Sequence, residues 1–136
     1  MTRPFFRLDI AVRWRDLDAF NHVNNASYLS YIEEARVLWL KSLDSDWAGA
    51  AAAPILAAIQ VNYRRPVGWP EALRVELFAE RVGNKSLTLG HRIVSASSPE
   101  QLFADGHSVL VWVNRDGQSV ALPESVVQAA AGNGSD

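Results

Sequence analysis

The side chains best suited to chemistry lie close together near the N-terminus. Asp16, Asp18, His22, Asn24 and Asn25 fall in a polar segment that directly precedes a predicted helix. A helix N-terminus offers unpaired backbone N–H groups and a partial positive charge. A carboxylate beside such donors can attack a carbonyl, or activate water to attack it, while the donors stabilise the oxyanion. The segment therefore suggests acyl-group chemistry, although turn aspartates also often bond their own backbone.

A strand and a long helix are predicted on either side of this polar segment. In residues 6–14, apolar and polar side chains alternate, which is typical of a strand. From Tyr28 the apolar residues recur at steps of three and four, which predicts an amphipathic helix to about Ser42. Asn24, Asn25 or Ser27 could cap its start. The apolar stripe is expected to contain Tyr28, Leu29, Tyr31, Ile32, Ala35, Leu38 and Trp39, with Glu33, Glu34, Arg36 and Lys41 largely outside it.

The rest of the chain predicts one antiparallel sheet. Four further strands are expected at residues 55–63, 73–82, 86–95 and 102–114, and a short helix at 123–131. Gly83-Asn84 is a candidate two-residue hairpin, because both residues tolerate a positive φ. No strand–helix–strand alternation follows the first helix, so the later strands should pair antiparallel. The fold class is therefore α+β, with one sheet packed on one long helix.

Composition narrows the possible functions. The 136 residues are expected to form one domain over residues 1–131, followed by a flexible tail at 132–136. A net charge of -2 gives no reason to expect a nucleic-acid partner. The lack of cysteine excludes disulfides and thiolate sites, and the three histidines lack metal-site spacing, so no metal is expected. No segment resembles a signal peptide or a bilayer span of about 20 apolar residues, so a soluble, cytoplasmic protein without membrane partners is expected.

The order of elements and several motifs resemble the hotdog-fold acyl-CoA thioesterases of the 4-hydroxybenzoyl-CoA thioesterase type. One position differs, because many relatives have glycine where this chain has Asn21. Asparagine is the next best residue at positive φ, so the turn is expected to survive. The matching blocks are Val12-Arg13, Asp16-Leu17-Asp18, His22-Val23-Asn24-Asn25, Tyr28-Leu29, Glu33-Glu34-Ala35-Arg36, Asn62-Tyr63-Arg64-Arg65-Pro66-Val67, Asn84-Lys85-Ser86, Val111-Trp112-Val113 and Leu122-Pro123-Glu124.

The resemblance implies a sheet of about five strands wrapped around a long central helix, and hydrolysis of acyl-CoA. Asp18 matches the residue that performs the chemistry, as nucleophile or general base, and Asn25 matches the residue whose backbone N–H polarises the thioester carbonyl. Lys85 and Ser86 match a site for the nucleotide end of coenzyme A. Family sites lie between subunits, so a homodimer or homotetramer is implied. Coenzyme A enters only as part of the substrate, and no cofactor is implied.

Several alternatives remain open at the level of sequence. His22 could orient water, bond Asp18 or hold the turn, and Asn24 could position substrate or cap the helix. Asp16 is expected to be structural, by capping the turn or holding Arg13 or Arg15. The remaining candidates are Glu33 or Glu34 as an alternative base, Lys85 and Arg64 or Arg65 as phosphate contacts, and Tyr28 in the acyl pocket or simply in the core. Two other functions are a hotdog dehydratase or hydratase that uses His22 with Asp18, and an acyl-CoA-binding dimer without activity.

Overall fold

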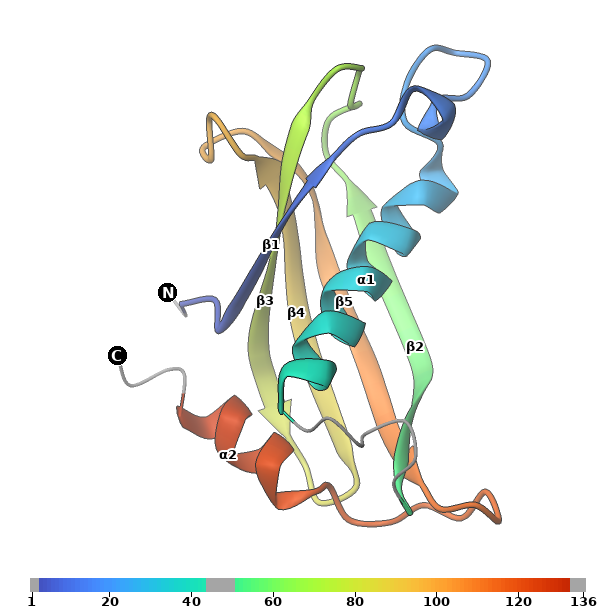
Figure 1. Ribbon diagram of the computed structural model, residues 1–136, viewed down its shortest axis with the longest axis vertical. Helices are drawn as coiled ribbons and strands as arrows, with labels where there is room; N and C mark the ends of the chain where they lie inside the picture. Colours follow the sequence, from blue (N-terminus) through green and yellow to red (C-terminus); the bar gives the residue numbers. More distant parts are fainter. Residues whose placement is uncertain (1–2, 44–50, 133–136) are drawn as a thin grey trace.

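The computed structural model describes residues 3–43 and 51–132, and its elements follow the predicted order (Figure 1). The strands are β1 (Phe6–Ala11), β2 (Ala53–Tyr63), β3 (Ala72–Val82), β4 (Ser86–Ser95) and β5 (Leu102–Val113). The helices are a short 3-10 turn, η1 (Trp14–Asp16), the long helix α1 (Asn25–Leu43) and the C-terminal helix α2 (Glu124–Gly132).

The strands form one five-stranded antiparallel sheet in the order β1-β3-β4-β5-β2. Helix α1 crosses one face of this sheet, and none of the helices in residues 3–43 and 51–132 covers the opposite face (Figure 1). The predicted α+β layer and the antiparallel pairing are therefore confirmed. Strand β2 follows α1 in the chain but forms the far edge of the sheet, beyond β5.

Alternation along the strands explains why one sheet face carries the core. In β3, Leu73, Val75 and Leu77 are fully buried, whereas Arg74 and Glu76 between them point to the other face and are half-buried. Each buried leucine or valine contributes about 1.5–3 kcal/mol relative to an exposed one. Burial of this row against α1 and the neighbouring strands therefore fixes which face the helix covers.

The buried face of α1 differs from the predicted stripe at four positions. Leu29 and Leu38 are 39% and 36% exposed, whereas Arg36 and Leu40, which the stripe did not include, are each only 6% exposed. The Arg36 side chain extends across the helix–sheet interface, where its Nη1 lies 3.5 Å from Ser108 Oγ of β5. Burial lowers the pKa of Arg36, although the charge of Glu33 acts in the opposite direction. An arginine can occupy such a buried position because its long apolar stem packs against the core, although burial of the charged guanidinium is unfavourable.

The connections also differ slightly from the predictions. The β3–β4 loop contains three residues rather than two, because Gly83 N–H donates to Ser86 O (2.8 Å) and β4 begins at Ser86. The predicted short helix is present as α2 and extends to Gly132, so the expected tail does not begin at that residue. Residues 133–136 of that tail, and residues 44–50 of the connector after α1, lie outside the described residues. Of the helices described, none is long and apolar enough to cross a membrane.

Candidate active site

The turn before α1 is held together by its own backbone. Leu17 and Val23 form an isolated antiparallel bridge, and the Asp18 N–H donates to the His22 carbonyl at 2.9 Å. The Asn21 N–H donates to the Asp18 carbonyl at 3.0 Å, and Asn21 adopts φ 67°. Asparagine is one of the few non-glycine residues that adopts this left-handed region readily. The turn therefore forms with asparagine in place of the glycine of many relatives.

Only one oxygen of the Asp18 carboxylate stabilises this turn. Oδ1 accepts hydrogen bonds from the backbone N–H groups of Phe20 (2.9 Å) and His22 (3.5 Å). This local bonding is the structural role that turn aspartates commonly have. Among residues 3–43 and 51–132, Oδ2 accepts no hydrogen bond and the carboxylate forms no ion pair. One oxygen thus remains available to a substrate or to water.

Asp16, two residues earlier, has a different environment. Its Oδ2 accepts hydrogen bonds from Arg13 N–H (3.0 Å) and from the Tyr31 hydroxyl (2.7 Å), and Arg13 Nε lies 3.9 Å away. Burial acts to raise the pKa of Asp16, but these bonds and the nearby arginine charges outweigh it and lower that pKa. Asp16 therefore has the structural role predicted for it, and the predicted contact with Arg13 is confirmed.

The first turn of α1 leaves one backbone donor open. Asn24 is the cap, because its Oδ1 accepts the Ala26 N–H (2.8 Å) and its carbonyl accepts the Ser27 N–H (2.9 Å). The Asn24 N–H itself donates to the Asp16 carbonyl at 2.8 Å. The first residue of an α-helix has no intrahelical partner for its N–H. Among the described residues, the Asn25 N–H makes no hydrogen bond and is available as a donor.

A pocket of about 460 Å³, which we call the Asp18 pocket, lies between the Asp18 turn, the start of α1 and the end of β2. It brings together Asp18, His22, Asn25, Tyr28 and Arg64, which the sequence had singled out for catalysis or substrate binding. Tyr28 is otherwise buried in the core, and its ring meets that of Tyr63 edge-on at 4.9 Å. The other lining residues are Phe20, Val23, Tyr63, Arg65 and Pro66. The pocket thus combines an available carboxylate, an available helix donor, two arginines and an apolar wall.

Other predicted site residues lie elsewhere in the protomer. The Asn24 side chain caps α1 and does not line this pocket. Lys85 and Ser86 belong to the β3–β4 hairpin, at the end of the sheet nearest α2 and opposite to the Asp18 turn (Figure 1). Glu33 and Glu34 are exposed on α1 and also lie outside the pocket.

Tyr63 was not identified as a site residue from the sequence, although it belongs to a matching motif. It is the last residue of β2, and its hydroxyl donates to the Asn25 carbonyl at 3.0 Å. The two residues are 38 positions apart, and no local pattern indicates that they meet. The pairing of β2 with β5, which places β2 at the sheet edge, creates this contact.

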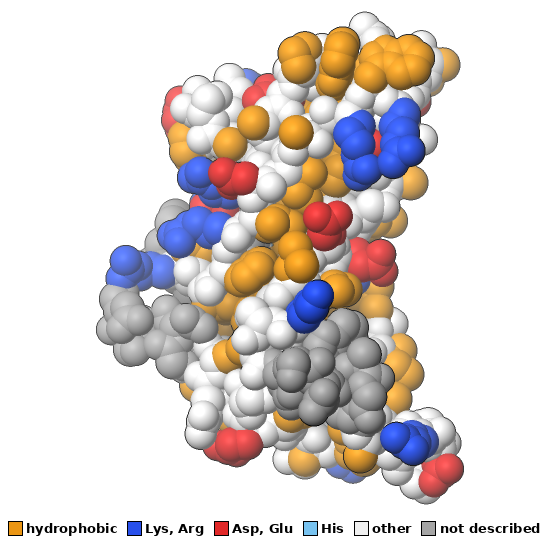
Figure 2. All heavy atoms as spheres, in the orientation of Figure 1, with side chains coloured by type: hydrophobic (Ala, Val, Ile, Leu, Met, Phe, Trp, Pro, Cys, Tyr) orange, Lys and Arg blue, Asp and Glu red, His pale blue; other side chains and the backbone are white. Residues whose placement is uncertain are grey.

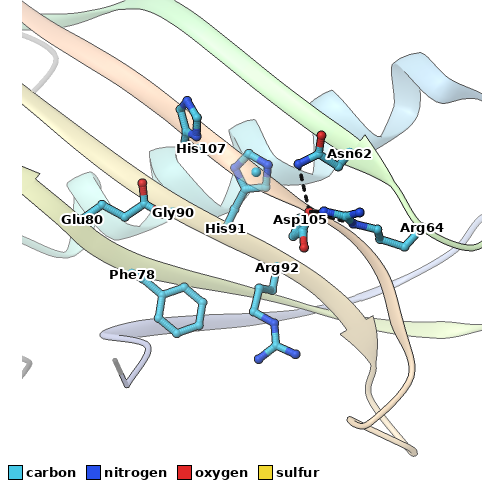
Figure 3. A pocket seen from close by; sticks show the side chains of 10 residues that line it. Asn62, Arg64, Phe78, Glu80, Gly90, His91, Arg92, Asp105 and His107 are labelled. Atoms are coloured by element: carbon cyan, nitrogen blue, oxygen red, sulfur yellow. Dashed lines mark hydrogen bonds and ion pairs between the residues drawn. The ribbon is translucent and has the colours of Figure 1, made fainter. Parts of the chain in front are cut away.

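A second pocket, of about 420 Å³, lies on the sheet face opposite α1, and Arg64 lines both pockets (Figure 3). Asp105 Oδ1 accepts hydrogen bonds from Arg64 Nε (3.1 Å) and Asn62 Nδ2 (3.1 Å), and Arg64 Nη2 lies 3.0 Å away. In this outer-face pocket the Asp105 carboxylate is therefore engaged by the neighbouring Arg64 and Asn62. Nowhere in the described part of the chain do three acidic or histidine side chains gather closely enough to hold a metal ion.

The chain is similar to proteins of known family. The family model of the thioesterase-like superfamily matches residues 12–130. The long-chain acyl-CoA thioesterase FadM of Escherichia coli (strain K12) is 34% identical over 107 residues, which span 77% of this chain and 80% of FadM.

Solved structures agree with this match. The PA2801 protein of Pseudomonas aeruginosa has a TM-score of 0.89 and 39% identity, over 93% of this chain and 98% of that chain. A thioesterase of Thermus thermophilus, solved with coenzyme A and Zn, has a TM-score of 0.84 and 30% identity, over 100% and 98% of the two chains. The antiparallel sheet, the long helix on its face and these matches lead to one conclusion: the chain belongs to the thioesterase-like superfamily and is a thioester hydrolase with the hotdog fold.

Proposed function

We propose that the protein hydrolyses acyl-CoA to a free acid and coenzyme A, with Asp18 and the backbone N–H of Asn25 as its catalytic groups. The observation that carries this proposal is that both groups line one pocket while neither is engaged by another described side chain there. Thioester hydrolysis requires a nucleophile or base and a donor for the oxyanion, and these two groups supply them.

Two chemical routes fit the geometry. In the first, an Asp18 oxygen attacks the thioester carbon, the C–S bond breaks, and coenzyme A leaves as a thiolate that takes a proton from solvent. Water then hydrolyses the acyl-aspartyl anhydride. In the second, Asp18 takes a proton from a water molecule whose oxygen attacks the same carbon, the C–S bond breaks, and the departing thiolate takes the proton from Asp18. In both routes negative charge develops on the carbonyl oxygen, where the Asn25 N–H would donate. His22, which lines the same pocket, is placed to orient the water.

The coenzyme A moiety requires positive charge at the mouth of the pocket. Arg64 and Arg65 are exposed there and are suited to phosphate groups, which guanidinium binds well. We propose that Lys85 and Ser86 also contact the nucleotide end, but from a second protomer. Because Asp18 and Lys85 lie at opposite ends of one protomer, only a neighbouring chain can bring a Lys85 side chain to Asp18.

A homodimer through the β2 edge provides that arrangement. If two β2 edges pair antiparallel about a two-fold axis, the Asp18 end of one protomer lies beside Lys85 of the partner subunit. Ile55 and Leu56 of β2 are 50% and 42% exposed, and Leu29 and Leu38 of α1 are also exposed. Hydrophobic side chains indeed reach the surface over α1 and along the β2 margin (Figure 2). Such an unpaired apolar edge favours pairing with another strand. Two dimers could associate again as a tetramer.

Long-chain acyl groups are the first substrates to test. FadM, a relative that covers most of this chain, is a long-chain acyl-CoA thioesterase, and Phe20, Tyr28 and Tyr63 give the pocket an apolar wall. We place the reaction in the cytoplasm, since a chain without cysteine suits a reducing compartment.

The decisive experiment follows free thiol from a panel of short, medium, long and aromatic acyl-CoAs. Asp18→Asn should lower kcat by about 10²–10⁴-fold, because the amide can neither attack nor take the proton. Asp116→Asn is the matched control, since Asp116 is also a turn aspartate but is exposed and lies outside the pocket. Full activity of Asp18→Asn would disprove the assignment of Asp18. Conversion of the acyl group without thiol release would indicate hydratase or dehydratase chemistry, and tight binding without any turnover would indicate a binding protein.

A further inference from the structure

Tyr63 connects the edge strand to the start of the helix. It ends β2, it lines the Asp18 pocket, and its hydroxyl donates to the Asn25 carbonyl at 3.0 Å. Its ring is held edge-on against the buried Tyr28, with the ring centroids 4.9 Å apart and the planes at 87°. The hydroxyl is therefore fixed relative to the core, although Tyr63 as a whole is 46% exposed.

The hydrogen bond from Tyr63 is one of two bonds that restrain the peptide group between Asn25 and Ala26. The carbonyl of that group accepts from Tyr63, and its N–H donates to Asn24 Oδ1 at 2.8 Å. A peptide group is planar, so two bonds at opposite ends of the plane set its orientation. The Asn25 N–H is joined to this peptide group through the Asn25 Cα, across the φ and ψ bonds of that one residue. The direction of this open donor therefore depends on both bonds.

We propose that Tyr63 is a positioning residue that aims the Asn25 N–H at the thioester oxygen. The inference rests on the proposed function, in which that N–H stabilises the oxyanion. An oxyanion donor is effective only when it is directed at the place where charge develops, and one donor contributes about 10²–10³-fold to kcat. Tyr63 does not need to touch the reacting atoms for this role. Loss of its hydroxyl leaves the donor in place but less tightly oriented, since only the bond to Asn24 then restrains the peptide group.

The first test is Tyr63→Phe, which keeps the ring and removes the hydroxyl. We expect kcat to fall about tenfold, as a fraction of what a whole oxyanion donor supplies, with KM within about twofold of wild type. The thermal unfolding midpoint should stay close to the wild-type value, because the ring contact with Tyr28 remains. Gln128→Ala is the control, since it removes a hydrogen bond from the surface of α2, far from the pocket. A Tyr63→Phe protein with wild-type kcat would overturn the inference.

A spectroscopic test distinguishes a change in the orientation of the Asn25 N–H from a general loss of stability. Acyl-CoA labelled with ¹³C at the thioester carbonyl is bound to Asp18→Asn, which holds substrate without turnover. Its carbonyl resonance should lie downfield of its position in water, and should move back toward that position in Asp18→Asn/Tyr63→Phe. An identical resonance in both proteins would refute positioning by Tyr63. If Asp18→Asn instead retains turnover, the proposed function itself fails, so the two failures are distinguishable.

A second variant covers the case in which Tyr63→Phe does not fold. Asn24→Ala removes the other bond to the same peptide group and should also lower kcat more than it raises KM. Asn24→Asp keeps an acceptor for the Ala26 N–H and should restore most of the activity. Equal kcat in Asn24→Ala and wild type would show that the orientation of this peptide does not matter.

Discussion

The Asp18 pocket and the outer-face pocket share the Arg64 side chain, yet they differ in how their charged groups are used. On the outer face, Asp105 is bonded by Arg64 and Asn62, and Arg92 lies 3.8 Å from Glu76. In the Asp18 pocket the carboxylate has no cationic partner among the described residues, and the helix start has an open donor. Neutralised charges stabilise a surface, whereas an available carboxylate next to an available donor can act on a substrate.

The difference indicates that pocket size is a poor guide to function in this molecule. The two pockets have similar volumes, about 460 and 420 Å³, and each is lined by at least one carboxylate, two arginines and at least one histidine. What separates them is the carboxylate beside the shared Arg64: Asp105 accepts hydrogen bonds from Arg64 and Asn62, whereas Asp18 has no side-chain partner among the described residues. Changes in the outer-face pocket should therefore affect stability, and changes in the Asp18 pocket should affect turnover.

The largest effect on stability is expected at Gly106, in the floor of the outer-face pocket. Gly106 has φ +148°, and a Cβ there would lie 1.9 Å from the Gln60 carbonyl oxygen of the neighbouring strand. Gly106→Ala should lower the free energy of unfolding by about 3 kcal/mol or more, because backbone must move. Denaturant unfolding measures this directly.

Gly90→Ala is the matched control for that change. A Cβ at Gly90 would lie 2.5 Å from Glu80 Oε2, the end of a flexible surface side chain that can rotate away. Its cost should stay below about 1 kcal/mol. If the two variants have equal free energies of unfolding, the close approach of the Gly106 backbone to β2 is not important for stability.

An effect of similar size is expected below neutral pH, from His91. His91 lies on the helix side of β4 and is 2% exposed, and neither ring nitrogen has a well-formed hydrogen bond among the described residues. Burial lowers the pKa of His91 to about 4; Arg36 and His107 act in the same direction, and Asp105 acts against them. Between pH 6.5 and 4, His91 is therefore protonated in the unfolded chain but largely neutral in the folded chain. Stability should fall as the pH is lowered through this window, by up to about 3 kcal/mol from this residue.

Unfolding curves of wild type and His91→Leu across that pH range isolate this contribution. Leucine matches the apolar Leu89 and Ile93 on the same strand face, so the variant should lose stability less steeply as the solution is acidified. Parallel pH profiles for the two proteins would show that His91 is protonated as easily in the folded state as in the unfolded state.

The smallest effect is expected at Asp105, where the outer-face pocket reaches the Asp18 pocket through Arg64. Asp105→Asn removes the charge that holds the Arg64 guanidinium. We expect KM for acyl-CoA to rise about two- to fivefold with little change in kcat, as for a surface charge that aids binding. Acyl-pantetheine lacks the nucleotide phosphates and should be unaffected. A large fall in kcat would mean that the outer face takes part in the chemistry, which would break the distinction between the pockets.

The sequence predicted what depends on neighbouring residues and missed what depends on distant ones. The strand before Asp16, the left-handed Asn21 and the helix with its asparagine cap follow from local turn and cap chemistry, and all are confirmed. The bonds from Arg36 to Ser108, from Tyr63 to Asn25 and from Arg64 to Asp105 join residues 72, 38 and 41 positions apart. Such pairs leave no periodic pattern in the sequence, because the order of the strands in the sheet decides which distant segments of the chain come together. The burial of Arg36 was missed for this reason.

The placement of Asp18 and Lys85 at opposite ends of one protomer has a consequence for mixed populations of chains. In the proposed dimer, each site takes Asp18 from one subunit and Lys85 of the partner subunit. Asp18→Asn and Lys85→Ala chains would each form impaired homodimers, but a hybrid of the two contains one site with both side chains intact. Unfolding and refolding the two variants together should therefore regain activity that neither has alone at low substrate concentration. Genetic complementation between two defective copies would follow from the placement of Asp18 and Lys85 at opposite ends of the protomer.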